Sequence, residues 1–445
     1  MNDDTAAAGD VPPGPSGLPL IGNTRQLAGN RLSFMTETAR EYGDVVKIDF
    51  ARGQDFYALF HPDHVRHVLV ENNEHYVKGE FFQNRLGLLG DGLLNAEGEA
   101  WREQRHQIEP AFHPDRISSY GETMVAFTER LIDRSDLPAV RNVHEDMMAL
   151  TLEIVADALF GVDIRDAESD VGDALGTVMG HFRRQTGRPV DIPEWIPISD
   201  NRQYRSARDT LDGVVEDIIT DRRTGGDAGD VVSMLLQGEM DAETIRDQVL
   251  TLLLAGHETT AQSLTFTTYL LATHPEVERR AQAELQDTLE GRPPTVTDLA
   301  DLPYLERVVR ESMRLYPPVP GIVREPTADD EIGGYRVPEG TTVTMSQWVV
   351  HRDPRFYDNP LAFDPQRWEH KGRDERHPFA YFPFGGGPRR CVGDRFAMLE
   401  ARLVLARLLQ SVRFETVPET TVDLSPAITL RPAGGLDLRA VPRPE

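Results

Sequence analysis

Apolar residues recur at three- and four-residue spacing along most of the chain, which is the period of a helix packed on one face. The clearest such segments are residues 61–72, 99–112, 119–133, 145–161 and 209–223. Shorter segments alternate instead and predict strands, at 44–50 and 56–60. Two further segments, 334–350 and 421–441, predict hairpins, the first with its turn at 338–340. The pattern therefore predicts a mainly helical protein with a few short strands.

The longest predicted helix begins at Asp241, a favourable N-cap residue, and ends near Thr273, before His274 and Pro275. At 1.5 Å per residue it would be roughly 48 Å long, enough to cross a whole domain. Its apolar sequence is interrupted at the centre by AGHETT, residues 255–260. Two later helices are predicted at 302–317, where a Pro-Pro pair ends the helix, and at 393–411.

Proline and glycine are concentrated in residues 11–23 and predict an extended arm, so we place an N-terminal arm at 1–22. The glycine-rich segments at 224–230 and 291–294 are short enough to be loops within one domain. We therefore expect a single domain over residues 23–445.

The chain is strongly acidic, with 47 basic and 73 acidic residues and a formal charge of −26. Nucleic-acid binding requires clustered positive charge, so this function class is excluded. Only Lys47, Lys78 and Lys371 are lysines. An acidic excess with few lysines favours a halophilic protein, because salt screens the self-repulsion. The alternative is an ordinary acidic surface encoded by a GC-biased genome.

The single cysteine excludes an internal disulfide framework and a multi-cysteine zinc or iron–sulfur site. The first ten residues are polar and acidic, without the apolar core of a signal peptide. No apolar run reaches membrane-spanning length. These features predict a soluble, cytoplasmic protein without a membrane span or anchor.

The cysteine lies in the most informative segment, where glycine-rich sequence leads into the predicted helix at 393–411. Helix N–H groups, together with Arg389 and Arg390, would stabilise a thiolate at Cys391. Gly393 would let a flat ligand approach the backbone. Two alternatives remain from the residues alone. One is an inert buried thiol. The other is a nucleophile of a cysteine hydrolase, for which no histidine is marked out by a motif.

The spacing Phe384-x-x-Gly387-x-Arg389-x-Cys391-x-Gly393 resembles the haem-binding signature of the cytochrome P-450 superfamily. The resemblance implies a mainly α fold with two small antiparallel sheets. It also implies a haem b cofactor, with Phe384 and Gly393 in its binding loop and the Cys391 thiolate as proximal ligand of the iron.

Three further motifs carry the same resemblance in the expected order. The long helix holds Gly256, Glu258 and Thr259 within AGHETT, an acid–alcohol pair that in this family helps to deliver protons during dioxygen activation. Gly256 would let the helix pass close to the haem. Glu311 and Arg314 form the ExxR pair. The third motif, at 363–368, supplies Arg367, and the resemblance implies that these three residues form a buried structural network.

Cations for the haem propionates are also implied by the resemblance. Trp101 and Arg105 fit the W-x-x-x-R pattern of a helix that contacts one propionate. Arg324 and Arg389 match two further propionate contacts. Taken from the residues alone, Trp101 could be a core residue and each arginine could be solvated.

The resemblance implies a monooxygenase that inserts one atom of O2 into an apolar organic substrate. Electrons would come from NAD(P)H through a separate reductase and a ferredoxin or flavodoxin. Residues 79–94, 176–195, Ala255, 318–323 and 427–430 would line the substrate pocket, and a fatty acid, terpenoid or steroid would fit. Two alternatives remain: an O2-independent haem-thiolate isomerase or peroxygenase, and a haem-binding sensor or carrier. The Glu258–Thr259 pair argues against both.

Overall fold

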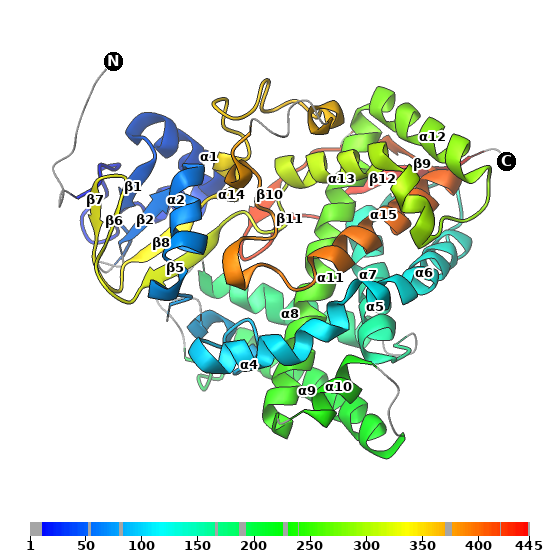
Figure 1. Ribbon diagram of the computed structural model, residues 1–445, viewed down its shortest axis with the longest axis horizontal. Helices are drawn as coiled ribbons and strands as arrows, with labels where there is room; N and C mark the ends of the chain where they lie inside the picture. The colour runs from blue at the N-terminus through cyan, green and yellow to red at the C-terminus, as the bar shows by residue number, and fades with distance from the viewer. Residues whose placement is uncertain are drawn as a thin grey trace.

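The computed structural model describes residues 11–51, 55–79, 83–164, 168–186, 193–225, 230–238, 240–369, 376–418 and 420–443. Helices dominate the described chain, and the strands gather mainly at one side of the molecule (Figure 1). The helices are α1 (Thr24–Tyr42), α2 (Pro62–Arg66), α4 (Gly98–Ile108), α5 (Pro114–Ser119), α6 (Gly121–Asp133), α7 (Val143–Phe160), α8 (Glu168–Thr186), α9 (Ser199–Gly225), α10 (Val231–Gln237), α11 (Ala242–Thr273), α12 (Pro275–Leu289), α13 (Pro303–Leu315), α14 (Gln347–Val350) and α15 (Asp394–Ser411).

Helix α11 is the predicted long helix and crosses the interior of the molecule (Figure 1). Its start is confirmed, because the Asp241 carboxylate accepts a hydrogen bond from the backbone N–H of Thr244 at 2.8 Å. Residues on all sides of α11 are buried. A helix that is buried all round forms the core of a large domain, and here it places AGHETT at the centre of the molecule.

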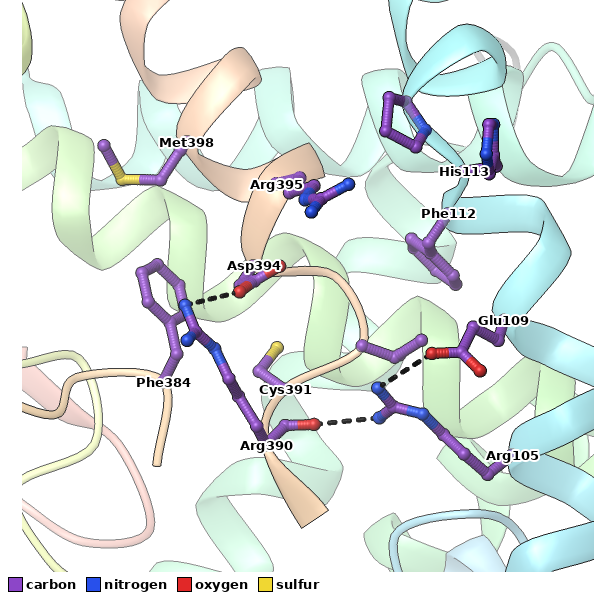
Figure 2. Close-up of a pocket in the computed structure, with 12 residues that line it drawn as sticks. Arg105, Glu109, Phe112, His113, Phe384, Arg390, Cys391, Asp394, Arg395 and Met398 are labelled. Carbon is purple, nitrogen blue, oxygen red and sulfur yellow. Dashed lines mark hydrogen bonds and ion pairs between the residues drawn. The ribbon is translucent and has the colours of Figure 1, made fainter. Parts of the chain in front are cut away.

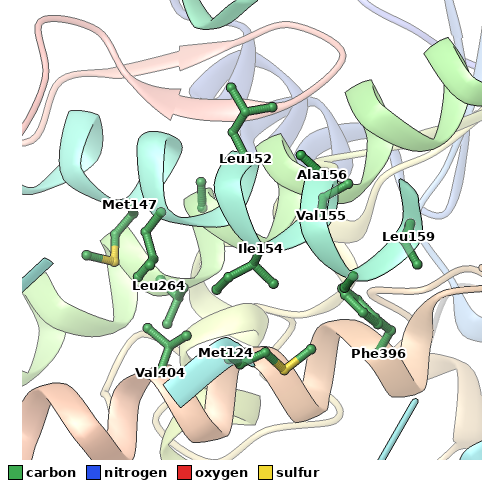
Figure 3. Close-up of a cluster of buried hydrophobic side chains, with 14 of the residues drawn as sticks. Met124, Met147, Leu152, Ile154, Val155, Ala156, Leu159, Leu264, Phe396 and Val404 are labelled. Atoms are coloured by element: carbon green, nitrogen blue, oxygen red, sulfur yellow. The ribbon is translucent and has the colours of Figure 1, made fainter. Parts of the chain in front are cut away.

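The largest core cluster joins α11 to α6, α7 and α15 (Figure 3). Met124, Ile154, Leu264 and Val404, one from each of these helices, are fully buried. Burying an apolar side chain of this size stabilises the fold by about 1.5–3 kcal/mol. This packing fixes α15 against α11, and so fixes the cysteine loop before α15 relative to AGHETT.

Strands in the described residues form four small sheets. Most pairs are antiparallel, as expected, although β2 and β8 are parallel, with Phe56 opposite Thr342. The fold class is confirmed. The largest sheet has the order β1-β2-β8-β5-β3, and the strands are β1 (Val45–Ile48), β2 (Phe56–Leu59), β3 (Tyr76–Val77), β4 (Ala139–Asn142), β5 (Ile322–Pro326), β6 (Asp330–Ile332), β7 (Tyr335–Val337), β8 (Thr342–Met345), β9 (Val412–Thr416), β10 (Leu424–Pro426), β11 (Leu430–Pro432) and β12 (Asp437–Pro442).

The predicted hairpin at 334–350 is wrong. Strand β7 pairs with β6 through Gly333 and Gly334, which both have positive φ and form the tight turn. Strand β8 is buried and lies between β2 and β5, and residues 347–350 are helical. The hairpin expected at 421–441 is shorter than predicted. It comprises β10 and β11 only, because β12 leaves it to pair with β4 and β9.

The described part of the arm, from residue 11, lies against β1, where the Lys47 N–H donates to the Pro13 carbonyl at 2.9 Å. Residues 1–10 lie outside the described residues. Among the helices that the structure describes, none combines the length and the apolar character needed to cross a bilayer.

Candidate functional site

The loop before α15 holds Cys391 in a fixed backbone. Gly387 has a φ of 65°. A Cβ at this position would lie only 1.8 Å from the Leu69 carbonyl oxygen, so no larger residue fits. The Cys391 N–H donates to the Phe384 carbonyl at 3.0 Å. Gly393 caps α15, as predicted, but its φ of −93° does not require glycine.

A cavity of about 620 Å³ opens beside the loop, and the Cys391 side chain lies within it (Figure 2). Arg105 crosses from α4 to donate to the Arg390 carbonyl at 2.8 Å, with Glu109 3.7 Å from the same guanidinium. Arg105 therefore ties α4 to the cysteine loop. The cavity is lined by Arg105, Glu109, Phe112, His113, Pro114, Phe384, Arg390, Cys391, Val392, Asp394, Arg395 and Met398.

The Cys391 sulfur is accessible from this cavity and yet largely surrounded by protein atoms. Burial is the largest influence and raises the pKa of the Cys391 thiol above its ordinary value. The Gly393 N–H and Arg390 lower the pKa of the thiol, as the sequence predicts, and Arg105 does so too, but burial and the Asp394 carboxylate outweigh them. Arg389 points elsewhere, so its expected effect on the sulfur is absent. A stable thiolate here needs a further cation at the sulfur.

Positive charge gathers between β3, β5 and the cysteine loop, on Lys78, Arg324 and Arg389. We call these residues, with Glu97, the Lys78 cluster. Lys78 is buried, and its ammonium donates to the Leu93 carbonyl at 3.1 Å and to that of Leu94. Arg389 is paired with the Glu97 carboxylate and lies over the ring of Trp101, 4.5 Å from the ring centroid.

The pKa values in the Lys78 cluster show a shortage of negative charge. Burial, then repulsion from Arg389 and Arg324, lowers the pKa of Lys78 to about 7. Burial lowers the pKa of Arg324 to about 10, and repulsion from Arg389 acts in the same direction. Within the described residues, Glu97 is the one carboxylate that acts on all three cations. The cluster therefore favours the binding of an anionic ligand.

The centre of α11 is open on one face. Ala255 is exposed and Gly256 and Thr259 are partly exposed, while Leu254, His257, Glu258 and Thr260 are buried. A four-residue spacing puts Ala255 and Thr259 on the same face of the helix. Gly256 also packs closely against a second helix. A Cβ on Gly256 would meet Val155 of α7 at 3.1 Å, so this glycine permits close packing of two helices.

Glu258 and Thr259 do not contact each other. The Thr259 hydroxyl donates to the Ala255 carbonyl of its own helix at 2.9 Å. Glu258 is 1% exposed, and its Oε1 accepts hydrogen bonds from Thr429 at 2.5 Å and from Arg431 at 2.7 Å. Sequence reasoning missed both partners, because nothing in the chain pairs residue 258 with a hairpin some 170 residues later.

The predicted network of Glu311, Arg314 and Arg367 is confirmed. We call it the Glu311 cluster. Arg314 donates to both Glu311 carboxylate oxygens, at 2.9 and 2.8 Å, and Arg367 donates to Oε1 at 2.7 Å. Trp368 adds a hydrogen bond at 2.9 Å, and further Arg314 N–H groups reach backbone carbonyls, including that of His351 at 2.7 Å. The cluster is closed and structural.

Comparison with known proteins gives a consistent result. A family model described as Cytochrome P450 matches residues 12–436. Cyclooctat-9-en-7-ol 5-monooxygenase of Streptomyces melanosporofaciens is 36% identical over 92% of this chain and 90% of that protein. The chain belongs to the cytochrome P450 family. Pentalenene oxygenase of Streptomyces avermitilis is 31% identical over 95% of this chain and 94% of that protein.

A solved structure of the heme domain of cytochrome P450DA has the same fold. It matches with a TM-score of 0.89 and 28% identity, over 98% of this chain and 99% of that chain. With the named monooxygenase relatives, this makes the chain a cytochrome P450 monooxygenase. The named relatives therefore favour a monooxygenase over the haem-binding sensor or carrier.

Cytochromes P450 bind a haem iron, and the residues present fit that group. The two propionates of a haem would supply the negative charge that the Lys78 cluster lacks. A metal ion at the Cys391 sulfur would supply the cation that its thiolate needs. Arg389 lies over Trp101 and repels Arg324, so these three residues lie near one another. Arg105, one helical turn after Trp101, donates to the Arg390 carbonyl. The propionate contacts expected of these four residues stay predictions.

Proposed function

We propose that this cytochrome P450 binds haem b through Cys391 and inserts one atom of O2 into a cyclic terpenoid. The observation that carries the proposal is the excess of positive charge on buried Lys78 and half-buried Arg324 and Arg389 beside the cysteine loop, which suits the two propionates of haem b. The substrate class is supported by two relatives, named for cyclooctat-9-en-7-ol and pentalenene. Both compounds are cyclic and largely apolar.

The proposed substrate region is supported by a contact between two predicted lining segments. The Leu430 N–H of the C-terminal hairpin donates to the Pro318 carbonyl at 2.8 Å. Helix α8 presents the buried apolar side chains of Val178, Met179 and Phe182. Residues 80–82 and 187–192, also predicted to line the pocket, lie outside the described residues. An apolar lining favours a hydrocarbon skeleton over a charged substrate.

Several residues would hold the cofactor. Cys391 would bind the iron as a thiolate, and Phe384 and Gly393 would border it. Arg324, Arg389 and Lys78 would bind the propionates. The Trp101 ring packs against the Arg389 guanidinium. Arg105 donates to the Arg390 carbonyl and so holds the cysteine loop. When bound, haem activates O2 for insertion into a C–H bond.

On the other side of the site, α11 would supply protons. Thr259 lies on the open face of the helix and would orient the reacting dioxygen through its hydroxyl. Glu258 would act as the general acid and recover its proton from solvent. In the resting arrangement the Glu258 carboxylate is turned towards the C-terminal hairpin, so the acid must change partners before it acts.

Electrons would come from NAD(P)H through a separate reductase and a ferredoxin or flavodoxin. The cavity beside Cys391 is lined by the arginines Arg105, Arg390 and Arg395 and by the acids Glu109 and Asp394, a small positive excess in a chain whose total charge is −26. A local excess of positive charge suits an acidic electron carrier and would speed its encounter with the protein.

The cofactor assignment is tested by the absorption spectrum of the reduced protein with CO. The wild type should show the red-shifted Soret band of thiolate ligation, and Cys391→Ser should lose it. A wild type without this band contradicts the assignment.

Substrate and reaction are tested with pentalenene and cyclooctat-9-en-7-ol under ¹⁸O2. A shift of the haem spin state and a product that carries one ¹⁸O atom are expected. Thr259→Ala should bind substrate normally but release peroxide instead of product. Fully coupled turnover in Thr259→Ala would remove Thr259 from the proton path.

A further inference from the structure

A partly buried carboxylate holds a turn of the chain that lies against the cysteine loop. Residues His67–Glu71 form a π-helical turn, in which the Asn72 N–H donates to the His67 carbonyl at 2.8 Å. We call these residues the π turn. Such turns are rare, and they occur frequently at functional sites. The Asp330 side chain, which is 14% exposed, comes from β6 and contacts the π turn at both of its ends.

Three donors converge on one oxygen of this carboxylate. Asp330 Oδ2 accepts hydrogen bonds from His67 Nε2 at 2.8 Å and from the Asn72 amide at 3.0 Å. The Tyr76 hydroxyl on β3 donates to the same oxygen at 2.6 Å. Burial raises the pKa of Asp330, but these hydrogen bonds and one from the Glu331 N–H outweigh it and lower the pKa below its ordinary value. Asp330 is therefore ionised at neutral pH, and the hydrogen bonds that it accepts are charge-assisted.

The π turn supports the cysteine loop at its centre. Leu69, the central residue of the turn, is buried, and a Cβ on Gly387 would lie 1.8 Å from the Leu69 carbonyl oxygen. Because glycine has no side chain, the two backbones meet directly at this contact. Leu69 also shares an apolar cluster with Phe382, which precedes the loop. Gly387 lies four residues before Cys391, so a shift of the π turn would move the backbone that carries the sulfur.

We propose that Asp330 is a positioning residue that sets the place of the Cys391 sulfur through the π turn and Gly387. The proposal rests on the proposed function, in which this sulfur binds the haem iron. A metal ligand must be held within about 0.5 Å of its productive geometry by the contacts behind it. Asp330 does not line the cavity at the sulfur, so it acts only through the loop.

Asp330→Asn tests the carboxylate without a change of size. An amide that turns its NH2 group to the three donors repels them. One that turns the other way brings the NH2 group against the Glu331 N–H, which donates to Asp330 Oδ1 at 2.8 Å. Asp329→Asn is the matched control on the neighbouring residue, because the Asp329 side chain is 53% exposed and pairs with Arg336.

Alkylation of the haem-free protein by iodoacetamide measures the position of the loop, because Cys391 is the only cysteine in the chain. A loop released from the π turn exposes the sulfur. Asp330→Asn should therefore react about tenfold faster than wild type, the effect of losing one hydrogen bond to a charged group. Asp329→Asn should stay within about twofold of the wild type. An unchanged rate in Asp330→Asn overturns the proposal, and so does a rise that its urea unfolding curve accounts for by global unfolding.

His67 provides a second test that does not depend on the folding of Asp330→Asn. His67→Phe keeps a ring but removes the donor, whereas the side-chain amide in His67→Gln can still donate to Asp330. The alkylation rate should rise in His67→Phe and return towards the wild-type rate in His67→Gln. Equal rates in these two variants would overturn the proposal.

Haem-loaded protein gives a spectroscopic test of the same role. The red-shifted Soret band of the reduced CO adduct should decay about tenfold faster in Asp330→Asn than in wild type or Asp329→Asn, because the sulfur is held less firmly. Equal decay in all three proteins overturns the proposal. A wild type without this band contradicts the proposed function instead, and the alkylation series still decides the role of Asp330.

Discussion

Two clusters of buried and half-buried charge differ in their balance. In the Glu311 cluster, two guanidiniums and an indole N–H surround one carboxylate, and the remaining Arg314 N–H groups reach backbone carbonyls. The pKa of Lys78 falls to about 7 in the other cluster, where the described residues provide one carboxylate for three cations. The Glu311 cluster therefore has a partner for each of its charges, whereas the Lys78 cluster lacks negative charge.

The difference separates charge that maintains the fold from charge that awaits a ligand. A buried ion pair costs desolvation energy, which is recovered only when every charge and donor has a partner. The Glu311 cluster meets this condition within the protein. The Lys78 cluster does not, so its cations destabilise the haem-free protein and bind an anion strongly. Substitutions in the two clusters should therefore affect different measurements.

The largest effect is expected from breaking the closed cluster. Glu311→Gln removes the charge that holds Arg314 and Arg367, both buried, and should lower the free energy of unfolding by about 3–5 kcal/mol. Urea unfolding measures the change. Glu306→Gln is the control on the same helix, because its side chain is 39% exposed and 3.7 Å from Arg310. A loss of less than about 1 kcal/mol in Glu311→Gln would show that the cluster is not structural.

The next effect concerns haem retention rather than folding. Arg389→Met removes a proposed propionate partner that also lies over Trp101. Loss of a charge-assisted hydrogen bond of about 1.5–3 kcal/mol should speed haem loss by about 10- to 100-fold. Transfer of haem to apomyoglobin measures the rate. Arg102→Met, with 62% of the wild-type side chain exposed, is the control and should stay near the wild-type rate. Equal rates in the two variants contradict the assignment of Arg389.

Sequence reasoning succeeded where a local pattern determines the structure. The N-cap at Asp241, the start of α15 after Gly393 and the ExxR network all follow from short motifs and helical periodicity. The segment 334–350 failed because its turn residues are compatible with a hairpin, while the pairing is decided by distant strands such as β2. Pairing between distant strands cannot be read from a local alternation.

In the candidate site, too, local sequence patterns predicted only some of the residues. Trp101, Arg324 and Arg389 were predicted by position in family motifs, but Lys78 and Glu97 belong to none of the motifs used. One signal did mark Lys78: it is one of only three lysines in the chain. Burial and repulsion at that position become visible only in three dimensions. The roles of Cys391, Glu258 and Thr259 stay predictions.

Lys78→Met should have opposite effects on the two forms of the protein. The pKa of Lys78 in the folded state, about 7, is below the ordinary lysine value of 10.5, so the unfolded chain binds more protons between these values. The stability of haem-free wild type should therefore rise as the pH increases from about 7 towards 10, where the unfolded lysine also loses its proton. Lys78→Met should lack this rise.

The same substitution removes a cation that the propionates would neutralise. At pH 7 the haem-free form of Lys78→Met should be more stable than wild type by about 1–2 kcal/mol, while haem loss becomes about tenfold faster. Thermal unfolding and haem transfer measure the two effects. If the haem-free form is destabilised instead, Lys78 is a structural lysine whose carbonyl contacts outweigh its burial.

The smallest effect is expected at the carboxylate of the open cluster. Glu97 pairs with Arg389, and its Oε1 accepts the Lys78 N–H at 2.9 Å, a bond that the amide oxygen of glutamine can keep. Glu97→Gln leaves the geometry but removes an anion that competes with the propionates for Arg389. Haem loss should slow by about two- to threefold, and the haem-free form should become less stable, the reverse of Lys78→Met. Faster haem loss would mean that Glu97 orients Arg389 towards the cofactor, and then the shortage of negative charge would not govern binding at this cluster.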